Sequence, residues 1–190
     1  MGWSIPTLAA AFLDGGARFL QLRAKSLPGA GLLDAATAVV RLAHAQNAIV
    51  IVNDRADIAR LSGADGVHVG QTDLSAAAVR RVLGSGIVGR STHTIAELEI
   101  AAHEPVDYVA VGPVFGTATK DTGHDPVGLE MVRRAAAGGR PVVAIGGITL
   151  DNALSVIAAG ARSVAVISDL MTGGDPAARV RAYVERLSCV

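Results

Sequence analysis

Short apolar runs and alanine-rich helical patterns alternate along most of the chain. The apolar runs are rich in Val and Ile, and most of them end in Gly, Asn, Asp or Ser, as buried parallel strands do. They cover residues 19–22, 49–52, 66–69, 87–89, 108–111, 142–145 and 163–167. Helical patterns precede, separate and follow them at residues 6–13, 32–46, 55–61, 75–83, 94–103, 128–137, 149–159 and 176–187. The sequence therefore predicts seven strands and eight helices.

Regular alternation of strand and helix is typical of a parallel sheet with right-handed crossovers. A closed eight-fold barrel and an open doubly wound sheet both fit that alternation. No Gly-x-Gly-x-x-Gly fingerprint follows an early strand, and polar residues gather after the strands, where barrel active sites are built. We therefore predict a single domain, residues 1–190, with the α/β fold of a (β/α)8 TIM barrel.

The pattern begins with a helix rather than a strand. A (β/α)8 barrel has eight strands and the sequence supplies seven, so the predicted barrel lacks its first N-terminal strand in this chain. A lost strand, an open barrel, or another chain or segment that fills the gap would each explain the pattern. The strand at residues 19–22 would then have an exposed flank, which favours association of copies into a homo-oligomer.

Composition narrows the class of protein and its partners. The formal net charge is zero, which gives no indication of binding to nucleic acid or to an anionic membrane. Charged residues or glycines interrupt every apolar run well before the roughly 18 residues of a membrane span. The single cysteine, Cys189, leaves no internal disulfide and fits a reducing compartment. Since the N-terminus has no secretory signal pattern, we expect a cytoplasmic protein.

Gln21, Arg23 and Lys25 stand at alternate positions of the first predicted strand. Alternate residues of a strand share a face, so an amide and two cations lie opposite Leu20 and Leu22. Two positive charges that point into the interior of a sheet are costly unless something anionic meets them. An exposed edge strand with a polar face explains these residues equally well on their own.

Two carboxylates follow the next two predicted strands. Asp54 comes after Asn53 at the end of the second strand, and Asp73 lies in the loop after the third. Each is also suited to cap the helix that follows. On adjacent loops they can share one hard cation, because Mg²⁺ typically takes one or two protein carboxylates and leaves its other positions to water and substrate phosphate. With Arg23 and Lys25 nearby, the pair favours a metal–diphosphate site.

Two glycine-containing loops complete the predicted site. Thr117, Thr119 and Lys120 lie in a glycine-flanked loop after the fifth strand, which suits either a solvated surface loop or a lid whose lysine reaches a phosphate. After the sixth strand, Gly146 and Gly147 lead toward a helix N-terminus, where backbone N–H groups bind phosphate. Barrels commonly form their phosphate site late in the chain, after the seventh and eighth strands of the complete fold.

The remaining candidates for chemistry are histidines. His68 lies inside the third strand, where an imidazole is more often a satisfied core group than a ligand. His93 lies at a strand end beside Ser91, near the predicted site. No nucleophile with a partnered base is recognisable, so the sequence does not support acyl transfer.

Taken in order, these clusters resemble thiamine phosphate synthase, a family of (β/α)8 enzymes of thiamine biosynthesis. The matching segments are Gln21-x-Arg23-x-Lys25, Asn53-Asp54-Arg55, Gly66-Val67-His68-Val69-Gly70-Gln71-x-Asp73, Ser91-Thr92-His93-Thr94, Gly112-Pro113-Val114-Phe115-x-Thr117-x-Thr119-Lys120 and Ala144-Ile145-Gly146-Gly147-Ile148. The family joins hydroxymethylpyrimidine diphosphate to hydroxyethylthiazole phosphate and releases diphosphate. The resemblance therefore implies small phosphorylated substrates and Mg²⁺ as the cofactor.

The resemblance also implies a role for each cluster. The diphosphate would be held by basic and amide side chains, namely Arg23, Lys25, Asn53 and Lys120. Gln21 and Ser91 would lie on the pyrimidine side, and Asp54 and Asp73 would bind Mg²⁺. The thiazole phosphate substrate would meet residues later in the chain, namely Thr117, Thr119, Gly147, Ile167 and Ser168. Arg23, Lys25, Ser91 and Lys120 would be the catalytic residues.

Two relatives with other functions match parts of the pattern. Thiazole tautomerase, a paralogue with the same fold, tends to have His where this chain has Pro113 and to lack the complete diphosphate and metal set. A non-catalytic regulatory relative that binds a phosphate ligand would keep only the phosphate site. Pro113, Asp54, Asp73 and Lys120 favour the synthase, while the absent strand leaves the regulatory alternative open.

Overall fold

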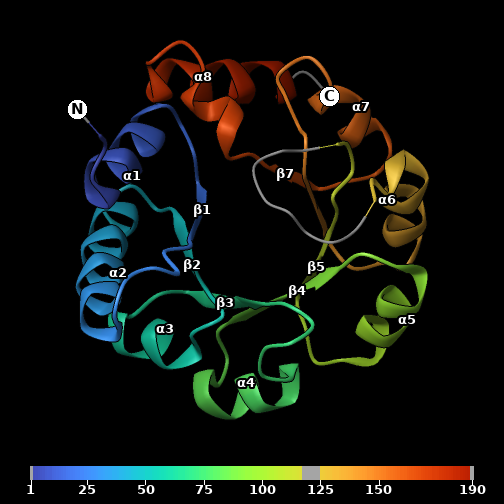
Figure 1. The fold of residues 1–190 in the computed structure, drawn as a ribbon, viewed down its shortest axis with the longest axis horizontal. Helices are drawn as coiled ribbons and strands as arrows, with labels where there is room; N and C mark the ends of the chain where they lie inside the picture. Colours follow the sequence, from blue (N-terminus) through green and yellow to red (C-terminus); the bar gives the residue numbers. More distant parts are fainter. Residues whose placement is uncertain (1, 117–124, 189–190) are drawn as a thin grey trace.

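The computed structural model describes residues 2–116 and 125–188. Within these ranges seven parallel strands form one sheet, and their spatial order follows their order in the chain. They are β1 (Phe19–Leu22), β2 (Ile49–Asn53), β3 (Gly66–Val69), β4 (Ile87–Thr92), β5 (Tyr108–Val111), β6 (Val142–Ile145) and β7 (Ser163–Ala165). The sheet curves around a central space and the helices lie outside it, as in a barrel (Figure 1).

All eight predicted helices are present in the described part of the chain. They are α1 (Ile5–Asp14), α2 (Gly29–His44), α3 (Ala56–Ser62), α4 (Ala76–Leu83), α5 (Ile95–His103), α6 (Gly128–Ala137), α7 (Ala153–Ala158) and α8 (Pro176–Leu187), with a short 3-10 helix η1 (Ser168–Met171) before α8. The side chains of Ser75 and Thr94 accept the backbone N–H groups of Ala78 and Glu97. Side-chain capping therefore fixes where α4 and α5 begin.

Two element boundaries differ from the prediction for identifiable reasons. Helix α7 begins at Ala153 rather than at residue 149. The Asn152 side chain accepts the Thr149 N–H at 2.9 Å and donates to the Gly147 carbonyl at 3.0 Å, which keeps this segment in a loop. Strand β7 ends at Ala165 rather than at residue 167, because the chain then turns into η1. The Asn152 side chain therefore shortens α7, and the turn into η1 shortens β7.

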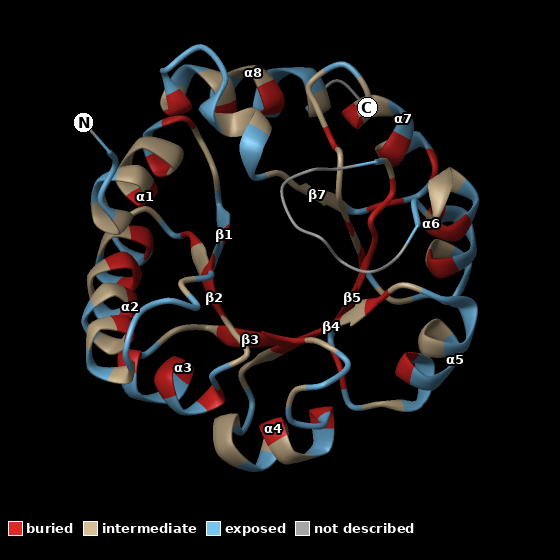
Figure 2. Cartoon of the chain, viewed as in Figure 1, coloured by how far each residue is buried: buried red, intermediate tan, exposed pale blue. Residues whose placement is uncertain are grey.

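The core lies between the sheet and the surrounding helices. In β1, Leu20 and Leu22 are buried while Phe19 and Gln21 are exposed, so the predicted two-faced strand is confirmed. Leu20 packs with Leu13 and neighbouring apolar side chains of α1 and α2. Strands β3 and β5 are buried along their whole length (Figure 2). Outward apolar side chains therefore hold the helices on the sheet, and inward positions remain for a site.

The helical layer continues across the flank where the described sheet is open. Strand β1 pairs with β2 and β7 pairs with β6, and the described residues place no strand between β1 and β7. There α1 packs directly on α8, and a Cβ added at Gly15 would lie 2.5 Å from the Ala177 carbonyl oxygen. The lack of a first N-terminal strand is consistent with this arrangement and stays a prediction. No helix in residues 2–116 and 125–188 is long and apolar enough to cross a bilayer.

Candidate functional site

The polar face of β1 points into the central space rather than out from an edge. The Phe19 ring meets the Tyr108 ring of β5 edge to face, with centroids 5.8 Å apart and an interplanar angle of 84°. A hydrogen bond also joins the Gln21 side chain to Tyr108. Both contacts cross the concave side of the sheet, from its first strand to its fifth. β1 is thus an exposed edge strand of the described sheet, as the alternative expects, but its polar face lies on the concave side.

A chain of hydrogen bonds runs from β1 to β4 through the interior. The Tyr108 hydroxyl meets His68 Nδ1 at 2.9 Å, and His68 Nε2 meets the Ser91 hydroxyl at 2.8 Å. Burial raises the pKa of Tyr108 well above its ordinary range, against the smaller opposite effect of Gln21, so the phenol stays protonated. His68 is the buried, satisfied core group that the sequence predicts. Gln21 and Ser91 thus belong to one connected polar network.

This network depends on a glycine beside the tyrosine. The His68 ring stacks on the Tyr108 ring with centroids 5.5 Å apart. Gly89 pairs in register with Tyr108, and a Cβ added at Gly89 would lie 2.1 Å from the Tyr108 ring. Any side chain at that position would displace the ring. The glycine in β4 therefore makes room for the tyrosine of β5.

Asp54 lies at the end of β2 and forms an ion pair with Lys25. The Lys25 Nζ atom is 2.9 Å from Asp54 Oδ2. The Asp54 N–H donates to the His68 carbonyl at 2.8 Å, which ties this residue to β3. The predicted role of Asp54 as a helix cap is wrong, since Arg55 occupies the N-cap position and instead chelates Asp57 with two hydrogen bonds. The ion-pair partner of the carboxylate is therefore Lys25 rather than a helix N-terminus.

Asp73 closes the loop after β3. Its Oδ2 accepts the Gly70 N–H at 2.8 Å, and Ser75 rather than Asp73 caps α4, so the alternative cap role is wrong here too. Both aspartates come from adjacent strand-end loops and are partly exposed. Within the described residues no group of three or more His, Cys, Asp or Glu side chains is placed to hold a metal. Because Mg²⁺ takes few protein ligands when substrate phosphate completes its shell, two such carboxylates would suffice, and the Mg²⁺ site stays a prediction.

Asn53 and Arg23 complete the described part of this end of the site. Asn53 ends β2, is half-buried and pairs in register with the inward-facing His68. Arg23 follows β1 and is exposed. The described side chains predicted for the diphosphate therefore come from the carboxyl ends of the first two strands, and Lys25 among them pairs with Asp54.

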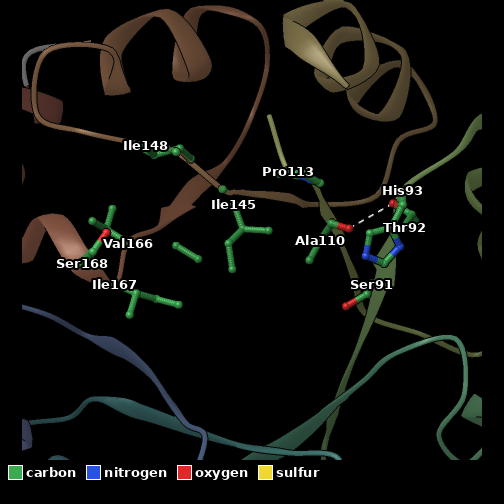
Figure 3. Close-up of a pocket in the computed structure, with 14 residues that line it drawn as sticks. Ser91, Thr92, His93, Ala110, Pro113, Ile145, Ile148, Val166, Ile167 and Ser168 are labelled. Atoms are coloured by element: carbon green, nitrogen blue, oxygen red, sulfur yellow. Dashed lines mark hydrogen bonds between the residues drawn. The ribbon is translucent and has the colours of Figure 1, made fainter. Parts of the chain in front are cut away.

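A pocket of about 120 Å³ lies between the ends of β4, β5, β6 and β7. Four predicted site residues line it, namely Ser91, Gly147, Ile167 and Ser168. Figure 3 shows Ser91 and His93 on one side and Ile167 and Ser168 on the other, with Ile145 between them. The structure thus brings together residues that are far apart in the sequence.

The glycine pair after β6 shapes the floor of this pocket. Gly146 and Gly147 have φ values of 95° and 63°, a region that favours glycine. A Cβ added at Gly147 would lie 2.5 Å from the Gly116 carbonyl oxygen and 2.8 Å from Phe115 Cβ. The Phe115 N–H also donates to the Gly146 carbonyl at 3.0 Å. The β5 and β6 loops are therefore in direct backbone contact, which only glycine allows at this point.

Sequence reasoning missed several residues that build the site. Tyr108, Phe19 and Asn152 have no place among the predicted site residues, although Tyr108 contacts Gln21, Asn152 contacts Gly147, and Phe19 packs on Tyr108. One signal was available for Tyr108: it is an inward-facing aromatic residue in a chain that is only 3% aromatic. The predicted residues Thr117, Thr119 and Lys120 lie outside the described residues, together with the predicted lid.

The family model for thiamine monophosphate synthase matches residues 3–170. The chain belongs to this family. A thiamine-phosphate synthase from Methanoculleus marisnigri is 45% identical over 176 residues, which are 92% of this chain and 83% of that protein. One from Synechococcus is 46% identical over 180 residues, which are 94% of this chain and 51% of the relative. The chain spans only 39% of a bifunctional thiamine biosynthesis protein from Symbiobacterium thermophilum.

Solved structures show the same arrangement. A thiamine phosphate pyrophosphorylase from Pyrococcus furiosus superposes with a TM-score of 0.90 at 30% identity, over 96% of this chain and 89% of that one. A 3-hexulose-6-phosphate synthase superposes with a TM-score of 0.72 at 21% identity, which shows a shared fold. The barrel-like arrangement of the sheet is therefore common to this family and to more distant enzymes.

Proposed function

We propose that this chain joins hydroxymethylpyrimidine diphosphate to hydroxyethylthiazole phosphate, which yields thiamine phosphate and diphosphate. Membership of the thiamine monophosphate synthase family supports this reaction. The observation that carries the proposal is that one concave site has a charged region on one side and a glycine-lined pocket on the other. Cations and carboxylates gather after β1, β2 and β3, and a glycine-floored pocket lies after β6 and β7. Two phosphorylated substrates require two such ends.

The diphosphate belongs at the end with the charged side chains. Arg23, Lys25, Asn53 and Lys120 would bind it, while Asp54 and Asp73 would hold Mg²⁺. When bound, Mg²⁺ supplies positive charge to the departing diphosphate oxygens. The Lys25–Asp54 ion pair keeps the ammonium group beside the carboxylate before substrate arrives. Such preorganised charge stabilises the negative charge that develops on a leaving group.

The reaction needs no protein base at the bond that forms. The bond between the pyrimidine methylene and the diphosphate oxygen breaks, and its electron pair leaves with the diphosphate. The ring amino group stabilises the resulting cation, and the lone pair of the thiazole nitrogen then forms the new C–N bond. Gln21 and Ser91 would orient the pyrimidine. They are held by hydrogen bonds to the Tyr108–His68 pair.

The pocket end would hold the thiazole phosphate at a fixed distance from the cation. Gly147, Ile167 and Ser168 would contact this substrate, with Thr117 and Thr119 contributing from the β5 loop. Holding both reactants in one orientation converts a bimolecular step into an effectively unimolecular one. The glycine backbone conformation and the Asn152 clamp on the β6 loop give this end a fixed shape.

A direct assay tests the proposal. Purified protein is mixed with both substrates and Mg²⁺, and product is followed by fluorescence after oxidation to the thiochrome. We expect product only when both substrates are present. Binding of thiazole phosphate without any product would reject the synthase function and favour a non-catalytic ligand-binding protein.

A further inference from the structure

Arg90 is a buried cation on the outer side of β4, directly behind the candidate site. Its side chain is 9% exposed, and its Nε lies 3.2 Å from Glu104 Oε2 at the end of α5. Its terminal nitrogens reach the loop after β3, where Nη1 donates to the Gly70 carbonyl at 2.8 Å and Nη2 to Gln71 Oε1 at 3.1 Å. A buried charge is tolerated only where it is paired: both terminal nitrogens of this guanidinium donate hydrogen bonds, and its Nε lies in ion-pair range of Glu104 Oε2, a buried oxygen without a hydrogen-bond partner in the described residues.

The Gly70 peptide connects Arg90 to Asp73. The Gly70 carbonyl that accepts from Arg90 also accepts the Asp73 N–H at 3.4 Å. The Gly70 N–H donates in turn to Asp73 Oδ2 at 2.8 Å. The backbone and the carboxylate of Asp73 are thus both tied to one glycine, and the guanidinium fixes the orientation of its carbonyl.

Gln71 connects Arg90 to Ser91. While its Oε1 accepts from Arg90, its Nε2 donates to the Ser91 carbonyl at 2.6 Å. The Ser91 hydroxyl then enters the interior network through His68. One buried arginine therefore sits behind a proposed metal ligand and a proposed pyrimidine-side group.

We infer that Arg90, anchored by Glu104, is a positioning residue that orients Asp73 for the metal and Ser91 for the pyrimidine. The inference rests on the proposed function for the identity of these ligands. A lysine in place of Arg90 keeps the charge opposite Glu104, but a single ammonium cannot reproduce a planar fork with three differently directed acceptors. Outer partners of this kind typically change metal affinity by about 10- to 100-fold.

Arg80 supplies a matched control at the opposite end of the strands. It is paired with Asp107 at 2.5 Å and donates to the carbonyls of Pro105 and Gly86. Arg80 therefore also joins one acid and two carbonyl-type acceptors, but far from Asp73 along the strand direction. Arg90→Lys and Arg80→Lys both keep the positive charge and lose the planar guanidinium with its several donors. A difference between the two variants therefore reports on the position of the arginine.

The readout is binding of Mn²⁺ to the full chain in the presence of inorganic diphosphate, followed by electron paramagnetic resonance. We expect Arg90→Lys to weaken Mn²⁺ binding by about tenfold and Arg80→Lys to leave it unchanged. Unchanged Mn²⁺ affinity in folded Arg90→Lys, equal losses in both variants, or no Mn²⁺ binding by the parent chain would each overturn the inference. Mn²⁺ binding without thiamine phosphate formation would reject the proposed function alone.

Gln71→Met keeps the test decisive if Arg90→Lys does not fold. Gln71 is exposed, so its replacement leaves the buried Arg90–Glu104 pair in place while removing the link to Ser91. We expect a normal melting temperature and parental Mn²⁺ binding, because the Gly70 link to Asp73 stays, but binding of hydroxymethylpyrimidine diphosphate weakened about threefold, because the link to Ser91 is lost. A Gln71→Met chain with parental affinity for that substrate, or with weakened Mn²⁺ binding, would overturn the inference.

Discussion

The two ends of the sheet use aspartates in different ways. At the amino end, Asp65 Oδ2 accepts the Val50 N–H at 2.7 Å and lies 3.1 Å from the His44 ring. Asp107 Oδ2 similarly accepts the Val88 N–H at 2.7 Å and pairs with an arginine. Each of these carboxylates precedes one strand and holds the backbone of the strand before it. The amino-end aspartates are therefore used to fasten neighbouring strands together.

At the carboxyl end, Asp54 and Asp73 lie in loops after the strands, at the proposed metal site. Asp54 pairs with Lys25, whose side chain is 56% exposed, and Asp54 itself has a left-handed φ of 63°. Holding a residue other than glycine in that conformation costs roughly 1–2 kcal/mol. Under the proposed function, identical side chains would stabilise the fold at one end and bind a metal at the other, as barrels generally divide these tasks.

The same substitution at both ends gives the largest expected contrast. Asp54→Asn should lower turnover by about 100-fold, because it removes a proposed metal ligand while asparagine still tolerates the left-handed backbone. Asp65→Asn should leave turnover near the parent value and lower the unfolding free energy by about 1 kcal/mol, because a charged acceptor becomes neutral. Steady-state kinetics and urea unfolding measure the two effects. Equal effects at the two positions would contradict the division between the ends.

Cations of equal exposure provide the next contrast. The side chains of Lys25 and Arg133 are both 56% exposed, and each pairs with an acid. Lys25→Met should lower kcat by about 10- to 100-fold, since its charge would stabilise the leaving diphosphate. Arg133→Met should leave kcat unchanged. It should change the unfolding free energy by no more than about 0.5 kcal/mol, because an exposed helical ion pair contributes little. The contrast fails if the Lys25 variant keeps parental turnover.

Two glycines with left-handed backbones allow the effect of backbone strain to be distinguished from the effect of a steric clash. A Cβ at Gly147 would meet the Gly116 carbonyl oxygen at 2.5 Å, whereas one at Gly139 has open space around it. Gly147→Ala should raise the KM for thiazole phosphate by about tenfold, as expected for a displaced substrate-positioning loop. Gly139→Ala should cost about 1 kcal/mol of stability without changing the KM. Similar KM values for both variants would show that the β6 loop does not shape the thiazole end.

The fold was predictable because buried apolar residues recur in the sequence at the spacings of strands and helices. Val- and Ile-rich runs such as Val67–Val69 had to be buried on both faces, and the seven strands all lie where these runs predict them. The start of α7 was not predictable, because it depends on the Asn152 side chain, which competes with helical hydrogen bonds. Local patterns thus locate elements better than they locate their ends.

The site was predictable in its membership but not in its connections. Asp54 and Asp73 are chemically suited to helix caps and to metal ligation, and only the positions of Arg55 and Ser75 in space exclude the cap roles. The interior network requires Gly89 to stand in register with Tyr108 on the next strand, which no local pattern reveals. Contacts between strands depend on their register, and the sequence of one strand alone does not determine its register with the next.

Asp169 sharpens the comparison, because it lies at the carboxyl end yet is bonded like an amino-end aspartate. Burial acts to raise its pKa, but hydrogen bonds from Tyr183 and Arg179 hold that pKa below its ordinary value. A lowered carboxyl pKa adds stability that is present above about pH 4 and is lost as the pH falls through the folded-state pKa. Tyr183→Phe should therefore lower the unfolding free energy at pH 7 by about 1–2 kcal/mol, and by less at pH 3. Urea unfolding at both pH values measures this difference, and a pH-independent loss would assign the effect to packing. A loss that is larger at pH 7 than at pH 3 would show that the hydrogen-bond partners of a carboxylate, rather than its position along the strand, decide whether it serves stability or chemistry.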